Sequence, residues 1–266
     1  MTALIAEVGL AHEGSLWLAH AYVDAVAGIA THVKFQAHSP LESSDLETWR
    51  TPPPTGESRR DYWQRTAFTR EQWAQLARHS REKGLYFGAS VFETNLVADL
   101  APLCDFLKVP SGAATHRPLL AAVARAGKPT YISDGLHRLP IDDADYATRW
   151  TRLICTSRYP TPLAESGINE IRPGVDGLSD HTGEPLTAAL AVYAGAVAVE
   201  VHVTFDRRTG LPDAGSSLTI DQLKEAKRLM DLAHAAKHGS RPAPDPAMQA
   251  KFGYALRDGV WSKPAA

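Results

Sequence analysis

The strongest constraint on the fold is a repeated alternation between short apolar runs and amphipathic segments. Each apolar run has the length and composition of a buried strand, and we expect strands at Leu4–Val8, His32–Gln36, Tyr86–Ser90, Phe106–Val109, Thr130–Ser133, Leu153–Thr156, Val175–Leu178 and Val197–Val203. The clearest helical patterns lie between them, at Leu16–Ala27, Glu71–Lys83, Arg117–Arg125, Pro185–Tyr193 and Ile220–His234. Parallel strands joined by crossover helices explain this alternation. Eight such units within 266 residues predict a closed α/β barrel, the (β/α)8 TIM barrel, rather than an open sheet.

Two segments interrupt this rhythm. Ala37–Phe68 is a long stretch rich in Pro, Ser and charge that follows the second strand, so we expect it over the C-terminal face of the barrel. The residues after Lys237 contain Pro242, Pro244 and Pro246 and predict an extended arm that packs against this subunit or another. The predicted organisation is therefore one barrel domain over residues 1–240 and a C-terminal tail over 241–266, with no second domain.

Composition excludes several classes of partner and location. The formal net charge is −2 and the pI is near 6.6, so neither nucleic acid nor an anionic membrane surface is an expected partner. No apolar run approaches the roughly 20 residues of a membrane span, and the N-terminus lacks the pattern of a signal peptide. Cys104 and Cys155 are expected as buried thiols rather than a disulfide. These features together predict a cytoplasmic protein.

Polar side chains gather at the predicted C-terminal strand ends, where barrel enzymes assemble their active sites. In chain order they are Glu7, His12, Lys34, Gln36, Ser90, Lys108, Ser111, Ser133, Ser157, Tyr159, Ser179, Asp180, His181, Glu200, His202 and Asp213. A single strand-end serine could equally cap a helix, and Glu7 could be a core carboxylate. Lys34 and Lys108 are stronger evidence for a binding site, because lysine in an apolar strand is costly to bury unless it meets an anion. Two lysines and several hydroxyls on one face predict a phosphate or carboxylate site.

Two histidines end neighbouring predicted strands. His181 and His202 could bring their imidazoles to one divalent ion, since histidine is the commonest metal ligand near neutral pH. The alternative is two unrelated strand-end histidines. His12 and His38 flank strand ends as well, but we expect them, with His116, at the surface or behind the ligands.

Several strand-end segments form an ordered set: IAEVGLAHEGS (Ile5–Ser15), VKFQ (Val33–Gln36), FGASVFE (Phe87–Glu93), LKVPSGA (Leu107–Ala113), ISDGL (Ile132–Leu136), CTSRYPTP (Cys155–Pro162), GLSDHTG (Gly177–Gly183), VEVHVTFD (Val199–Asp206) and GLPDAGSSL (Gly210–Leu218). In this order they resemble the N-acetylneuraminate (sialic acid) synthase family. The match runs in register from Leu4 to His234, and the YPTP and SDHTG elements make it specific.

The resemblance implies a function and a set of site residues. That family is a transferase family whose barrel binds phosphoenolpyruvate and a divalent ion, Mn²⁺ or else Mg²⁺, and joins three carbons to an aldehyde sugar. The products are phosphate and a 3-deoxy-2-keto acid, and its members form dimers. By motif, the metal ligands are His181 and His202, and the catalytic group is Glu7, Tyr159 and Asp213. The substrate-binding residues are Lys34, Gln36, Ser90, Lys108, Ser111, Ser133, Ser157 and Ser179.

Departures from the family pattern leave the acceptor open. Ala113 stands where the family has a glutamate that faces the sugar, Val201 where it has a basic residue, and Asp134 where it has threonine. The chain also ends before the C-terminal antifreeze-like domain that the family normally carries. These differences predict an acceptor other than N-acetylmannosamine. Two alternatives remain: a metal-dependent pyruvate aldolase or lyase on the same barrel, and a non-catalytic barrel that binds a sugar acid.

Overall fold

The computed structural model describes residues 2–39, 56–136, 150–172, 176–243 and 245–263. The chain forms two compact units, Met1–His234 and Ala235–Ala266, and helix α8 (Ile220–His238) contains the point at which they divide. The predicted boundary after residue 240 lies just beyond the end of this helix. Each unit is described separately below.

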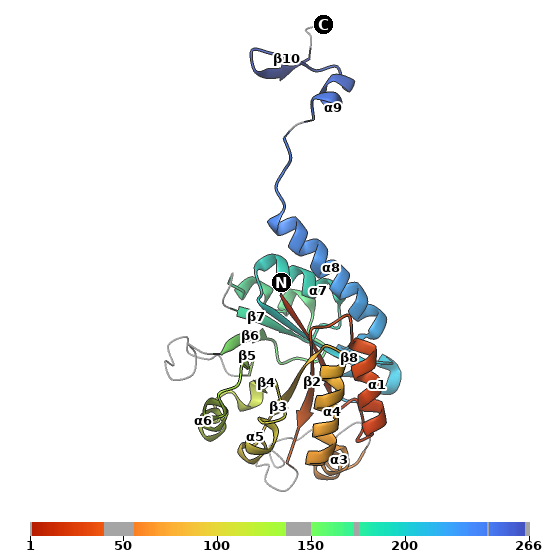
Figure 1. The fold of residues 1–266 in the computed structure, drawn as a ribbon, viewed down its shortest axis with the longest axis vertical. Helices are drawn as coiled ribbons and strands as arrows, with labels where there is room; N and C mark the ends of the chain where they lie inside the picture. The colour runs from red at the N-terminus through yellow and green to blue at the C-terminus, as the bar shows by residue number, and fades with distance from the viewer. Residues whose placement is uncertain (1, 40–55, 137–149, 173–175, 244, 264–266) are drawn as a thin grey trace. The chain divides into compact units, whose positions relative to one another are not determined.

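The first unit is a closed parallel barrel. Its strands are β1 (Ala3–Gly9), β2 (His32–Ala37), β3 (Tyr86–Val91), β4 (Phe106–Val109), β5 (Thr130–Asp134), β6 (Thr151–Cys155), β7 (Asp176–Asp180) and β8 (Ala198–Thr204). Each strand pairs in parallel with the next, and β8 pairs back onto β1, which closes the sheet. A short strand, β9 (Leu218–Thr219), pairs in parallel with the C-terminal end of β8. The structure therefore confirms the predicted (β/α)8 TIM barrel (Figure 1).

Helices connect the strands and lie around the outside of the barrel (Figure 1). They are α1 (Leu16–Val26), α3 (Arg59–Thr66), α4 (Arg70–Glu82), α5 (Thr94–Leu100), α6 (Arg117–Ala126), α7 (Pro185–Ala194) and α8. The 3-10 turns are η1 (Ser111–Ala113), η2 (Leu163–Glu165), η3 (Ile168–Glu170), η4 (Arg207–Thr209) and η5 (Ala214–Ser216). Helix α4 starts at a capping box in which Thr69 and Gln72 exchange side-chain and backbone hydrogen bonds. Gly127 ends α6 in the left-handed conformation, which costs glycine nothing.

Side-chain alternation along the strands separates an outer apolar layer from the barrel interior. Val33 and Phe35, on the outer face of β2, belong to the large core under the helices, while Lys34 between them points the other way. Inside the barrel, a small apolar cluster of Ile5, Phe106, Leu153 and Ala198 fills the end nearer the strand starts. A Cβ at Gly88 would collide with the Phe106 ring, so glycine is required for this filling. The polar strand ends lie above this apolar cluster.

The long segment after β2 contains one element that the sequence analysis did not predict. Helix α3 lies in it and is fixed to the β1–α1 loop, because the Tyr62 hydroxyl donates to Glu13 Oε1 (2.9 Å) and Arg65 Nη2 donates to Glu13 Oε2 (2.7 Å). Trp63 of α3 stacks on His38 with ring centroids 4.2 Å apart. The segment is therefore partly helical, and its described end covers residues near the C-terminal end of β2. Residues 40–55 lie outside the described part of the chain.

The second unit contains helix α9 (Pro246–Lys251) and an antiparallel hairpin, β10 (Ala255–Arg257) with β11 (Val260–Ser262). The predicted tail therefore contains regular secondary structure, because Asp245 caps a short helix and a turn at Asp258–Gly259 closes the hairpin. Several of its larger apolar side chains, including Phe252 and Leu256, are exposed. Among the described helices, none has both the length and the hydropathy needed to cross a membrane.

Candidate active site

Four buried charged residues form a layer across the barrel interior, directly above the apolar cluster. Lys108 Nζ lies 3.0 Å from both oxygens of Glu200, and Lys34 Nζ lies 3.5 Å from Glu200 Oε2. The Lys34 ammonium also contacts the Glu7 carboxylate. Glu7 Oε1 has no hydrogen-bond partner within the described residues, so it is available to a bound molecule. The register of the sheet explains this gathering, since Glu7 stands opposite Lys34 on one side and His202 on the other.

The charges in this layer are strongly coupled. Burial disfavours the charged form of Glu200, but Lys108 and Lys34 together outweigh burial and hold the pKa of Glu200 well below its usual value. Burial lowers the pKa of Lys34 to about 7, against the opposing attraction of Glu200. An anion that entered here would favour the protonated form of Lys34. The layer can therefore bind an anionic ligand with only a small change in the protonation of Lys34.

Hydroxyl groups surround the charged layer. Ser90 accepts a hydrogen bond from Lys34 Nζ (2.6 Å), and Ser179 donates to Glu200 Oε1 (3.0 Å). Ser111 and Ser157 lie 3.1 Å apart, hydroxyl to hydroxyl, at the ends of β4 and β6. Ser133 is buried on β5. The Gln36 amide lies beside Glu7, since a Cβ at Gly9 would be 3.5 Å from both side chains.

The two histidines lie two residues further along their strands than Ser179 and Glu200. Their ring centroids are 5.3 Å apart. His181 Nδ1 is 3.0 Å from the Thr156 carbonyl, so it carries the proton and leaves Nε2 as the free nitrogen. Burial lowers the pKa of His181 to about 4, with a further contribution from His202. Burial likewise lowers the pKa of His202 to about 3. Both rings are therefore neutral at pH 7, the form that binds metal.

This pair fits a divalent ion held by two protein ligands. The Thr156 carbonyl orients His181 in the way that outer hydrogen bonds orient metal-binding histidines. Asp213 Oδ2 lies 3.8 Å from His202 Nδ1, which is near the ring but beyond hydrogen-bonding distance. Within the described residues no group of three or more His, Cys, Asp or Glu side chains has a metal-binding arrangement. The remaining coordination positions would belong to water or substrate.

Tyr159 and Asp213 mark the side of the site nearest solvent. The Tyr159 ring packs against His181 with centroids 4.2 Å apart, and half of its surface is exposed. Asp213 is partly exposed, and it adopts a positive φ of 63° at the start of η5. The structure thus places these two predicted residues beside the histidines, and places Lys34, Ser90, Lys108 and Ser179 together below them.

Sequence reasoning missed the role of Glu200. It was recognised only as a strand-end residue, yet in the structure it joins both lysines and Ser179. The available signal was its position two residues before His202, which puts both side chains on the same face of β8. His12 and His38 were expected at the surface or behind the ligands. They do not lie at the surface, because both are buried by aromatic stacking, on Phe68 and between Trp63 and Phe92.

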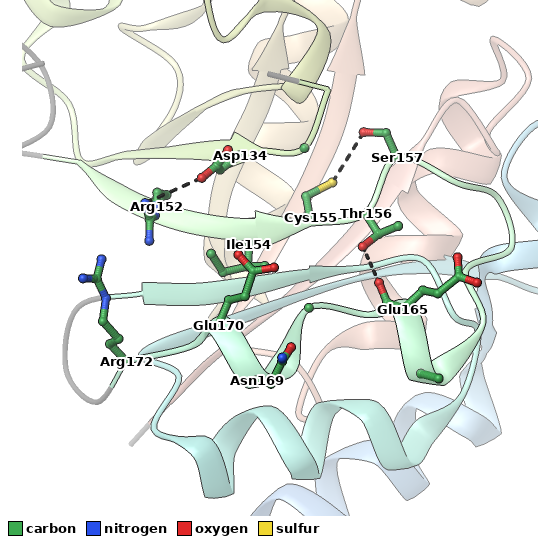
Figure 2. A pocket seen from close by; sticks show the side chains of 13 residues that line it. Asp134, Arg152, Ile154, Cys155, Thr156, Ser157, Glu165, Asn169, Glu170 and Arg172 are labelled. Carbon is green, nitrogen blue, oxygen red and sulfur yellow. Dashed lines mark hydrogen bonds and ion pairs between the residues drawn. The ribbon is translucent and has the colours of Figure 1, made fainter. Parts of the chain in front are cut away.

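A separate cavity of about 550 Å³ lies against β5, β6 and the turns η2 and η3 (Figure 2). Arg152 and Arg172 line it, but Arg152 is paired with Asp176 (2.9 Å) and with Asp134 (3.6 Å), and Arg172 also lies 3.6 Å from Asp176. Its positive charge is therefore largely compensated. Ser157 is its single residue in common with the predicted site residues, so we place the active site inside the barrel.

Comparison with known proteins gives one consistent result. A model of the NeuB family matches residues 23–240. N,N'-diacetyllegionaminic acid synthase of Campylobacter jejuni is 29% identical over 245 residues, which are 84% of this chain and 73% of the relative. N-acetylneuraminate-9-phosphate synthase of Homo sapiens is 28% identical over 253 residues, or 88% of this chain and 70% of the relative.

Solved structures agree with this result. N-acetylneuraminic acid synthetase of Leptospira borgpetersenii superposes with a TM-score of 0.76 at 24% identity, and the match covers 95% of this chain and 90% of the other. The spore coat polysaccharide biosynthesis protein spsE of Bacillus subtilis gives a TM-score of 0.71 at 26% identity, over 92% and 72% of the two chains. The family model spans most of the barrel, and this chain therefore belongs to the NeuB family.

Proposed function

We propose that this chain is a metal-dependent transferase that condenses phosphoenolpyruvate with a sugar or sugar-like aldehyde. The single observation that carries the proposal is the buried layer of Lys34, Lys108 and hydroxyl groups below a pair of neutral histidines. Its relatives are named as synthases of sialic-acid-type sugars. The negative charges of phosphoenolpyruvate complement the two lysine ammonium groups. The neutral carbonyl of the aldehyde suits the end of the site where the histidines would hold the metal ion.

Binding of phosphoenolpyruvate falls to the lower layer. The phosphate and carboxylate would meet Lys34 and Lys108, whose ammonium groups form charge-assisted hydrogen bonds to such anions. The serine hydroxyls would complete the hydrogen bonding, with Ser90 and Ser179 already bound to this layer. Glu200 fixes the two ammonium groups near each other before the substrate arrives. Such preorganisation means that little rearrangement is needed when charge develops.

His181 and His202 would hold the divalent ion, which we propose to be Mn²⁺, with Mg²⁺ as the alternative. When bound, it supplies Lewis-acid polarisation of the aldehyde oxygen. Tyr159 packs against His181 and thereby orients that ring. The partly exposed Asp213 lies on the acceptor side, where it can accept hydrogen bonds from sugar hydroxyls.

The reaction balances with one water molecule. C3 of phosphoenolpyruvate forms the new bond to the aldehyde carbon, whose oxygen becomes a hydroxyl. Water adds to C2, and cleavage of the C–O bond then releases phosphate and leaves the 2-keto group. Glu7 is the candidate base for this water, since Glu7 Oε1 is buried and has no hydrogen-bond partner within the described residues. Lys34, in contact with Glu7, can return a proton to the departing phosphate.

The acceptor is proposed to differ from N-acetylmannosamine. Ala113 is buried in turn η1 directly after β4, where the family resemblance implies a carboxylate that faces the sugar. A site that lacks this carboxylate leaves a sugar hydroxyl unpaired. That loss penalises the usual substrate by about 1–3 kcal/mol, or roughly 5- to 150-fold in kcat/KM.

Two product measurements test the proposed function. Purified protein with Mn²⁺, phosphoenolpyruvate and a panel of aldehydes should release inorganic phosphate and a 2-keto acid in equal amounts. The same mixture with pyruvate should give no product. Product from pyruvate, without phosphate, would establish the aldolase alternative. Absence of turnover with every aldehyde, together with absence of phosphoenolpyruvate binding by calorimetry, would refute the synthase function.

A further inference from the structure

A groove of about 760 Å³ crosses the rim of the barrel beside the candidate active site. It is lined by Arg158–Leu163 after β6, by Thr182, Glu184 and Leu186 around the start of α7, and by Arg207 after β8. This volume lies in the range of about 300–1,000 Å³ that small-molecule sites occupy. Tyr159 lines the groove and also packs on His181, 4.2 Å between ring centroids. The groove therefore begins at the metal end of the site.

Apolar side chains form much of the groove wall. Pro160, Pro162, Leu163 and Leu186 all line it, and Leu163 and Leu186 are 39% and 47% exposed. When an apolar group covers solvent-exposed leucine side chains in a groove, apolar surface is removed from water, and this favours binding. The groove thus suits a ligand with an apolar body.

The groove also contains a cation, Arg207, that forms no ion pair with the described residues. Arg207 donates hydrogen bonds to the carbonyls of Gly183 and Gly215, and no carboxylate in the described part of the chain forms an ion pair with it. Glu184 lines the groove without pairing to Arg207, whereas Arg158 is already paired with Glu165 at 2.8 Å. The carbonyl contacts hold the Arg207 guanidinium in place. A fixed guanidinium of this kind binds carboxylate or phosphate well.

Building on the synthase function above, we propose that the groove holds the part of the aldehyde acceptor remote from its reacting carbon. The acceptor is then an aldehyde with an apolar body and an anionic group, and Arg207 binds the anion. Its carbonyl end lies at the histidine pair and its body passes Tyr159. The apolar body then rests on Leu163 and Leu186. Carboxylate and phosphate would both satisfy Arg207.

A matched series of aldehydes tests the ligand class. Phosphate release from phosphoenolpyruvate with Mn²⁺ is measured for propanal, 3-phenylpropanal and 3-(4-carboxyphenyl)propanal. The KM of the aldehyde should fall along this series. The step from phenyl to carboxyphenyl should lower it about tenfold, as expected for one charge-assisted contact to a guanidinium.

Variants of Arg207 test the anion contact. Arg207→Met should remove the difference in KM between the phenyl and carboxyphenyl aldehydes, while the KM for phosphoenolpyruvate stays unchanged. Arg207→Lys should restore part of that difference. Arg208→Met is the matched control, because Arg208 is an exposed neighbour that pairs with Asp206 at 2.7 Å and does not line the groove.

A second variant avoids any disturbance of the loops that Arg207 holds. Leu186→Glu should raise the KM of the carboxyphenyl aldehyde at least tenfold and that of propanal little, because it adds a negative charge to the groove. Leu190→Glu, one turn further along α7, is the control, since Leu190 is similarly exposed but does not line the groove.

The outcomes separate the two proposals. If propanal supports phosphate release but the carboxyphenyl aldehyde has no lower KM than the phenyl one, the groove proposal is wrong and the synthase function stands. If no aldehyde gives phosphate and calorimetry finds no phosphoenolpyruvate binding, the synthase function fails and the groove proposal fails with it. If Leu186→Glu instead lowers the mass seen by light scattering, the groove is an interface between copies and the proposal is overturned.

Discussion

Glu200 offers a demanding test of the charged layer. Replacing Glu200 by Gln keeps the shape of the side chain but removes the negative charge that lies 3.0 Å from Lys108 Nζ and 3.5 Å from Lys34 Nζ. Lys34 keeps its contact with Glu7, but Lys108 is left buried without an ion-pair partner among the described residues. Breaking one side of a buried ion pair in this way costs about 3–5 kcal/mol.

Chemical denaturation measures this loss. The free energy of unfolding of Glu200→Gln should fall by about 3 kcal/mol with an unchanged dependence on urea, and the melting temperature by roughly 6–12 °C for a domain of this size. Addition of phosphoenolpyruvate should recover more stability in the variant than in the parent, because the ligand supplies the missing negative charge. Glu225→Gln, which removes an exposed partner of Arg228, should leave the midpoint unchanged. A loss below about 1 kcal/mol in Glu200→Gln would refute the arrangement.

Four further outcomes follow from the structure. Chelation should abolish phosphate release and added Mn²⁺ should restore it, and full activity of metal-free protein would contradict this. His181→Ala should lose both activity and Mn²⁺ binding, measured by calorimetry, while its circular dichroism spectrum stays unchanged. Lys34→Met should weaken phosphoenolpyruvate binding by about 1.5–3 kcal/mol, and an unchanged affinity would place the substrate elsewhere. Burial lowers the pKa of His12 and of His38 to about 3, so below about pH 6.5 the unfolded chain takes up protons that the folded state cannot. Each histidine should therefore lower the free energy of unfolding by about 2 kcal/mol between pH 7 and pH 5. In denaturation experiments at both pH values, His38→Gln should lose less stability at pH 5 than the parent. We propose a homodimer to which the tail contributes, so deletion of residues 247–266 should lower the mass seen by light scattering, and an unchanged mass would exclude that contribution.

The sequence predicted the barrel because strand and helix periods are local signals. Phe106–Val109 was predicted to the residue, and Lys34 and Lys108 stood out because each interrupts an apolar run. These properties need no knowledge of the rest of the chain.

Other parts of the site depend on contacts between distant segments. Glu200 acquires its role from lysines on two other strands, one of them 92 residues away. His12 and His38 are buried because Phe68 and Trp63 stack on them, and no local sequence pattern predicts these contacts. Helix α3 was missed because its sequence, RRDYWQRT, is too polar to show a helical stripe, and its position depends on Glu13. Long-range pairing of this kind cannot be inferred from one sequence.

The apolar cluster of Ile5, Phe106, Leu153 and Ala198 fills one end of the barrel interior. Within the described residues this cluster fills the interior below the charged layer, and His202 stands roughly 6–7 Å above Glu200 by the rise of a strand, so we expect ligands to enter and leave past the histidines. A ligand seated on the lysines must therefore arrive first, because an acceptor bound at the histidines would block its path. If the proposed function holds, phosphate formed at the lysines should leave only after the keto-acid product. The proposed synthase reaction should therefore be ordered, with phosphoenolpyruvate binding first and phosphate leaving last.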